Sequence, residues 1–155
     1  MRASLRTTLG VLAGLALAGC ASTSDPLQQP LGLDGTWVIV TANEQAPPAL
    51  MHDITYFDTG EHVQMFVTHD TITISGTTYR QRAVTYAESN GVRIGTQLVG
   101  DHGLVAQVGP DVHFESDFYQ NRTFDGTLAG GDLTVVQDLA AQGTTARYLL
   151  RRVSR

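Results

Sequence analysis

Three polar side chains that could do chemistry alternate along one short segment, namely His113, Glu115 and Asp117. Residues two apart in an extended strand point to the same face, so the imidazole and both carboxylates would lie together. Such a group could bind a divalent metal ion or pair a general base with a general acid. The intervening Val112 and Phe114 are apolar, which is the pattern of a strand whose polar face lies in solvent. We therefore expect a solvated outer face here and no metal site.

Other residue types that support catalysis are absent or poorly spaced. The five histidines, at positions 52, 62, 69, 102 and 113, include no pair at a characteristic metal-ligand spacing. The sequence has no lysine for a Schiff base, no Gly-x-Ser-x-Gly turn and no glycine loop of the phosphate-binding kind. The sequence predicts a protein that is not an enzyme, with no catalytic residue, no metal and no cofactor.

The one cysteine, Cys20, follows a segment with the order of a secretory leader. Arg2 and Arg6 form a charged start, and residues 9–18 are mostly apolar. This apolar stretch is shorter than the roughly 20 residues that a membrane-spanning helix needs. The small residues Ala18 and Gly19 complete the pattern of a cleavage site, so the sequence predicts export. Since Cys20 is the only cysteine, the chain cannot form an internal disulfide bond.

The run Leu17-Ala18-Gly19-Cys20 resembles the lipobox of bacterial lipoproteins. The resemblance implies that residues 1–19 are a signal peptide and that Cys20 is acylated, becomes the mature N-terminus and is acylated again, for example with palmitate. It also implies a lipid anchor in a membrane of the cell envelope. Ala21 in place of an aspartate implies sorting to the outer membrane, facing the periplasm, in a cell with two membranes.

The rest of the chain divides into a short tether and one domain. Residues 20–34 contain Pro, Ser and Gln without periodicity, which predicts a flexible tether. Residues 35–155 are enough for one domain with a continuous core. The formal charge of −5 becomes more negative when Arg2 and Arg6 leave with the leader. This balance disfavours nucleic acid as a partner and provides no polybasic membrane patch.

Apolar and polar residues alternate through the domain, as in Val63, Met65 and Val67, and no segment has a helical period. Turn pairs such as Asn90-Gly91 and Gly130-Gly131 separate these runs. We expect an all-β fold of about 8 to 10 antiparallel strands, closed as an up-and-down β-barrel so that no sheet edge stays free. A β-sandwich is the alternative. Separate strands are expected at 53–57, 62–68, 70–75, 92–99 and 103–108, with some merging.

The motif Gly35-Thr36-Trp37 and the C-terminal run Tyr148 to Val153 resemble those of the lipocalin and calycin superfamily. The segment FDGTLAGGDLTVVQ is similar to small lipocalin-like lipoproteins of bacteria. The resemblance implies that Trp37 lies at the closed end of the barrel beneath an arginine, a cation–π contact of about 0.5 to 2 kcal/mol. Strand alternation leaves open whether this arginine is Arg151 or Arg152. The Gly-Thr-Trp motif with the Gln-Ala-Pro-Pro segment also resembles META-type envelope domains.

A lipocalin-like barrel could bind a small hydrophobic ligand such as a lipid or fatty acid, because small-ligand sites are mostly apolar. The candidate lining residues are aromatic or Met: Trp37, Tyr56, Met65, Tyr79, Tyr86, Phe114 and Phe124. We expect residues 47–52 to form a lid over such a cavity. The alternative is a filled barrel that serves as a structural or protein-interaction module, META-like or inhibitor-like, with a partner that the sequence does not name.

Overall fold

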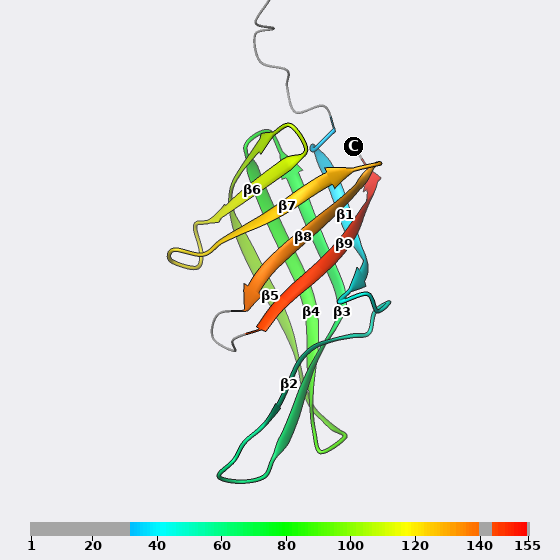
Figure 1. Cartoon of the computed structure of the whole chain (residues 1–155), viewed down its shortest axis with the longest axis vertical. Helices are drawn as coiled ribbons and strands as arrows, with labels where there is room; N and C mark the ends of the chain where they lie inside the picture. Colours follow the sequence, from blue (N-terminus) through cyan, green and yellow to red (C-terminus); the bar gives the residue numbers. More distant parts are fainter. Residues whose placement is uncertain (1–31, 140–143, 155) are drawn as a thin grey trace, which may run out of the picture.

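The domain is an all-β barrel, as the alternation of the sequence predicts (Figure 1). The computed structural model describes residues 32–139 and 144–154, and within them no helix could cross a membrane. The strands of this part are β1 (Gly35–Ala42), β2 (Ala49–Thr55), β3 (His62–Ser75), β4 (Thr78–Ser89), β5 (Val92–Val108), β6 (Asp111–Ser116), β7 (Thr123–Ala129), β8 (Asp132–Leu139) and β9 (Thr144–Ser154).

The sheet closes on itself through β1. Strands β3 to β9 follow one another as antiparallel neighbours, and β1 pairs with β9 on one side and β3 on the other. At the centre of this closure, Trp37 is the register partner of both Ile72 on β3 and Arg152 on β9. The expected antiparallel barrel is therefore confirmed, and the sandwich alternative is wrong, because a sandwich would leave β1 and β3 unpaired.

Two strands are longer than the sequence pattern indicated. The segments expected at 62–68 and 70–75 form one strand, β3, with a bulge between Val67 and His69. A bulge inserts one residue and reverses the alternation, and a reversed alternation within one strand resembles two separate strands. The segments at 92–99 and 103–108 are likewise joined in β5, because the turn-like residues Asp101 to Gly103 stay in the ladder with β4.

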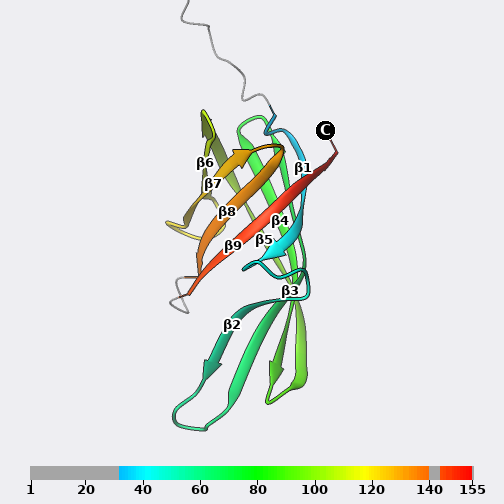
Figure 2. The same ribbon diagram turned by 45° about the vertical axis from the view of Figure 1, so that its right-hand side comes forward.

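The long strands extend beyond the barrel as a protruding sheet (Figures 1 and 2). It consists of β2 and the adjoining parts of β3, β4 and β5, and its outer strand β2 pairs only with residues 62–67 of β3. Residues 47–52 were expected to form a lid, and the strand before His62 was expected at 53–57. The expected strand is present as β2, although it begins at Ala49 and ends at Thr55. The lid prediction is wrong, because residues 49–52 belong to this strand.

The barrel end that contains Trp37 is tightly closed. The indole is fully buried and donates a hydrogen bond from Nε1 to the Leu33 carbonyl oxygen at 2.8 Å. The guanidinium carbon of Arg152 lies 4.6 Å from the centroid of the Trp37 ring, so Arg152 makes the stacking contact. Arg151 lies outside and pairs with Asp132, with Nε 3.0 Å from Oδ1. Leu33 is only 2% exposed, so the last residues assigned to the tether are packed against the barrel.

Two glycines of β5 differ in the space around them and provide a test of the close strand packing. A Cβ on Gly103 would lie 1.9 Å from the Glu115 carbonyl oxygen, whereas a Cβ on Gly95 would meet nothing within 4 Å. We expect Gly103→Ala to lower the free energy of unfolding by about 1 to 3 kcal/mol, as overpacking does. Gly95→Ala should be neutral or slightly stabilising, because alanine restricts the unfolded chain. Urea unfolding measures both, and equal effects would contradict the fold.

Candidate functional site

Four of the seven candidate interior residues fill the closed half of the barrel. Trp37, Tyr79, Phe114 and Phe124 are each 3% exposed or less. The rings of Phe114 and Phe124 stack with centroids 4.5 Å apart, and Tyr79 meets both of them edge-on. Side chains thus occupy the space in which a ligand of a hollow barrel would lie.

The other three candidates lie elsewhere, and only Met65 faces a cavity. Tyr56 was expected inside but is 46% exposed in the loop after β2. Tyr86 was also expected inside, yet it lies on the outer face of the protruding sheet, where it stacks on Phe66 with centroids 4.9 Å apart. Aromatic type does not distinguish the two faces of a strand when both carry large side chains.

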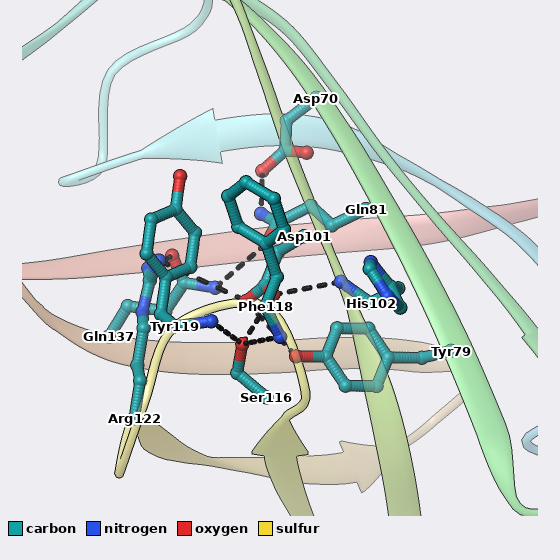
Figure 3. Close-up of polar contacts among 10 residues, drawn as sticks. All are labelled: Asp70, Tyr79, Gln81, Asp101, His102, Ser116, Phe118, Tyr119, Arg122 and Gln137. Carbon is teal, nitrogen blue, oxygen red and sulfur yellow. Dashed lines mark hydrogen bonds and ion pairs between the residues drawn. The ribbon is translucent and has the colours of Figure 1, made fainter.

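A set of polar side chains from several strands is joined by hydrogen bonds inside the barrel (Figure 3). Gln81 donates from Nε2 to Asp70 Oδ2 at 2.7 Å, and its own Oε1 accepts from Gln137 Nε2 at 3.1 Å. Arg122 then donates from Nη2 to Gln137 Oε1 at 3.2 Å. We name this set the polar layer, and its members are Asp70, Gln81, Asp101, Ser116, Arg122 and Gln137.

Asp101 joins the polar layer to the closed end. Its carboxylate accepts hydrogen bonds from the Tyr79 hydroxyl at 3.0 Å and from Ser116 Oγ at 2.6 Å. Arg122 Nη1 lies 3.9 Å from Asp101 Oδ2, so the charge of the guanidinium is matched within the layer. Burial, together with the negative charge of Asp101, raises the pKa of Tyr79 well above its ordinary value and keeps that hydroxyl a donor.

Asp70 is the least satisfied member of the layer. It is 1% exposed, and no described residue forms a hydrogen bond with its Oδ1. Burial raises the pKa of Asp70 to about 7, although the hydrogen bond from Gln81 opposes the rise. Burial and the nearby Asp70 also raise the pKa of Tyr148 above its usual range. Near neutral pH, the carboxyl of Asp70 therefore exists both with and without its proton.

A cavity of about 160 Å³ opens on the other side of the polar layer, where the barrel meets the protruding sheet. Its polar floor includes Gln81, Asp101, Arg122, Gln137 and Tyr148. Its apolar rim includes Met51, Met65, Val67, Ala83 and Val99. We name it the mouth cavity. The same sheet face continues outward through Ile54 and Val63, which are register partners and only partly exposed.

The residues first considered for metal binding do not form such a site. His113, Glu115 and Asp117 are all exposed, and His113 Nδ1 lies 2.7 Å from Asp125 Oδ1 on the neighbouring strand. Among the described residues, no group of three His, Cys, Asp or Glu side chains is arranged to hold a metal ion. Cys20 lies outside the described residues.

Sequence reasoning did not identify the polar layer, although a signal for it exists. Gln81 and Gln137 each stand two residues from buried apolar side chains, Tyr79 and Val135, and therefore at inward positions of their strands. Polar residues at inward positions of several strands predict a buried network when the register brings them to one level. Comparison of the chain with protein-family models, curated proteins and solved structures finds no match.

The pKa of Asp70 predicts a specific dependence of stability on pH. Since its pKa in the folded protein is about 7 rather than 3.8, the folded state binds the extra proton between these values. Its contribution to the free energy of unfolding therefore falls as pH rises from about 4 to 7. Each pH unit in this range should lower that contribution by at most about 1.4 kcal/mol. Asp70→Asn should remove the fall, because an amide does not titrate.

Urea unfolding at pH 5 and pH 8 measures this difference. The exposed Asp58→Asn is the matched control and should leave the pH dependence as it is. An equal change in both variants would show that Asp70 is not the titrating group.

Proposed function

We propose that this protein binds a small amphipathic ligand at the mouth of its barrel and catalyses no reaction. The observation that carries the proposal is the mouth cavity, which combines an apolar rim with a polar floor at the open end of an otherwise filled barrel. Ligand sites commonly have this composition, with apolar walls and a few polar groups that fix orientation.

The size of the cavity limits what enters it. A volume of about 160 Å³ is smaller than the roughly 300 to 1,000 Å³ that encloses a whole drug-sized ligand. One end of the ligand would enter the cavity, while the remainder lies along the face of the protruding sheet that includes Ile54, Val63 and Met65. An elongated molecule such as a lipid could place its polar end in the cavity and its apolar chain along the sheet.

The charges of the floor favour an uncharged polar end. Arg122 is already matched by Asp101, and Asp70 is a second buried carboxyl group nearby. The carboxylate of a free fatty acid would add another negative charge to this site, at a cost in free energy. A hydroxyl or amide end could instead hydrogen-bond to Gln137 or Tyr148 without that cost. Of the ligands considered from the sequence, a neutral lipid is therefore the better candidate.

We also propose that Cys20 is acylated and anchors the protein in the cell envelope. The described chain enters the barrel at the end that contains Trp37, and the protruding sheet lies at the opposite end (Figure 1). An anchor before Gly32 would therefore leave the mouth cavity accessible from the periplasm. This arrangement suits a ligand-binding module of the outer membrane.

A second candidate function is protein interaction through the protruding sheet. Phe57, Ile94 and Leu98 are all more than half exposed on this sheet or at its tip. Exposed apolar residues that cluster often mark an interaction surface. This candidate predicts a stoichiometric protein partner in crosslinked membranes, whereas ligand binding requires none.

Filling the mouth cavity should abolish ligand binding. Thr85 lines the cavity, and Thr96 lies on the outer face of the same sheet, opposite Tyr86. We expect Thr85→Trp to prevent the fluorescence increase of the neutral apolar probe N-phenyl-1-naphthylamine, and Thr96→Trp to retain it. Monooleoylglycerol should displace the probe at lower concentration than oleate. Equal probe binding by both variants would place the ligand outside the mouth cavity.

Acylation of Cys20 predicts a change in mass and in partitioning. The mature protein should begin at Cys20, have a mass increased by its acyl chains and enter the detergent phase. Cys20→Ser should lose the added mass and stay in the aqueous phase, because each buried CH₂ contributes about 0.8 kcal/mol to membrane binding. Mass spectrometry of the N-terminal peptide measures this, and an unmodified Cys20 would contradict the proposal.

A further inference from the structure

Two arginines without an acidic partner lie side by side on the outer face of β4. Arg80 and Arg82 are both exposed, and neither guanidinium forms an ion pair with a described residue. Being two residues apart in a strand, they point to the same side, opposite to the inward Gln81 between them. Neighbouring like charges repel, and this repulsion is relieved when an anion binds between them.

The register of the sheet surrounds these arginines with hydrogen-bonding side chains. Arg80 is opposite Thr73 on β3 and His102 on β5. Arg82 is opposite Thr71 on β3 and Gly100 on β5. Directly opposed residues have Cβ atoms about 4.5 to 5.5 Å apart, so both threonines and His102 are within reach of a group bound at the arginines. Gly100 adds no side chain, which leaves room beside Arg82.

The surface is hollowed at this place. A groove of about 790 Å³ runs over the outer face of β3, β4 and β5, and Arg80, Arg82, His69 and His102 are among its lining residues. Asp117 is the one acidic residue among the described residues that line it. We name it the cationic groove. Its charge is opposite to that of the whole chain, which has a formal charge of −5.

We propose that the cationic groove binds the phosphate group of an anionic lipid. Arginine presents a planar fork of donors that matches phosphate oxygens, and the pair can approach one phosphate from two sides. The hydroxyl of Thr73 and the ring of His102 supply further contacts.

Apolar surface beside the arginines favours a lipid over free phosphate. A second hollow of about 490 Å³ shares Arg80, Arg82, Leu98 and His102 with the groove and adds Phe118. Leu98 is 74% exposed and Phe118 61% exposed, so both offer apolar contact to an acyl chain or glycerol backbone. Arg80 and Arg82 point to the opposite face of the sheet from the mouth cavity, although the second hollow and the mouth cavity share Gln81, Val99, Gly100 and Asp101 as lining residues.

The test uses three soluble probes and the full-length chain carrying Cys20→Ser. The probes are dihexanoyl phosphatidylglycerol, dihexanoyl phosphatidylcholine and inorganic phosphate, each below any micelle concentration. Amide chemical shifts of Thr71 and Thr73, which line the cationic groove and not the mouth cavity, report binding. We expect saturable shifts with phosphatidylglycerol, at a concentration about tenfold or more below that needed for the other two probes. Equal affinity for all three, or no saturable shift with phosphatidylglycerol, would overturn the proposal.

Two variants that each remove one arginine charge test whether the lipid binds in the cationic groove. Arg82→Gln should weaken binding of phosphatidylglycerol about tenfold or more, the usual effect of losing a charge-assisted hydrogen bond. Arg147→Gln removes the same charge from an exposed position on β9, outside the groove, and should leave the affinity unchanged. Both side chains are exposed, so neither variant should unfold. Equal weakening by the two variants would indicate general charge attraction and refute the site.

Discussion

The whole structure depends on the closure of the barrel by the short strand β1. Of its eight residues, 35–38 pair with β3 and 36–42 pair with β9, and the buried Trp37 stands at the centre of the part that pairs with both. Strand β3 has 14 residues and β5 has 17, so β1 cannot accompany them along their full length. Beyond Val38, β1 no longer pairs with β3, so the cylinder is open on that side, and β2 pairs with residues 62–67 of β3 instead. One mismatch in strand length thus creates a closed end, an open mouth and a protruding sheet.

This mismatch also explains the order of side chains along the barrel axis. At the closed end, the rings around Phe114 fill the interior completely. Buried polar groups are stable only when they find partners, and the network from Asp70 through Gln81 to Gln137 supplies most of them. The network separates the packed aromatic end from the mouth cavity. The polar layer is therefore both the floor of the proposed ligand site and the boundary of the packed core.

The two faces of β4 serve different chemistry because side chains alternate along a strand. Gln81 points inward to the polar layer, whereas Arg80 and Arg82 point outward to the cationic groove. Inside, the charge of Arg122 is matched by Asp101, which favours a neutral ligand end. Outside, neither Arg80 nor Arg82 forms an ion pair with a described residue, which favours an anion. One strand of the barrel thus supports two proposed sites that differ in charge and in solvent access.

The sequence by itself determined the all-β class and the antiparallel barrel, because alternation and turn residues are local properties of the chain. The place of Trp37 was implied by the resemblance of the motif Gly35-Thr36-Trp37 to that of a known family. It also placed His113 on a solvated face. Only the tertiary structure decided that Arg152 stacks on Trp37 and that Tyr86 lies outside, because both depend on register across strands. The bulge after Val67 joined two expected strands, since one inserted residue reverses the alternation. Asp70 and Gln81 come from the neighbouring strands β3 and β4, whereas Gln137 comes from β8, and only the closed barrel brings Gln137 to their level.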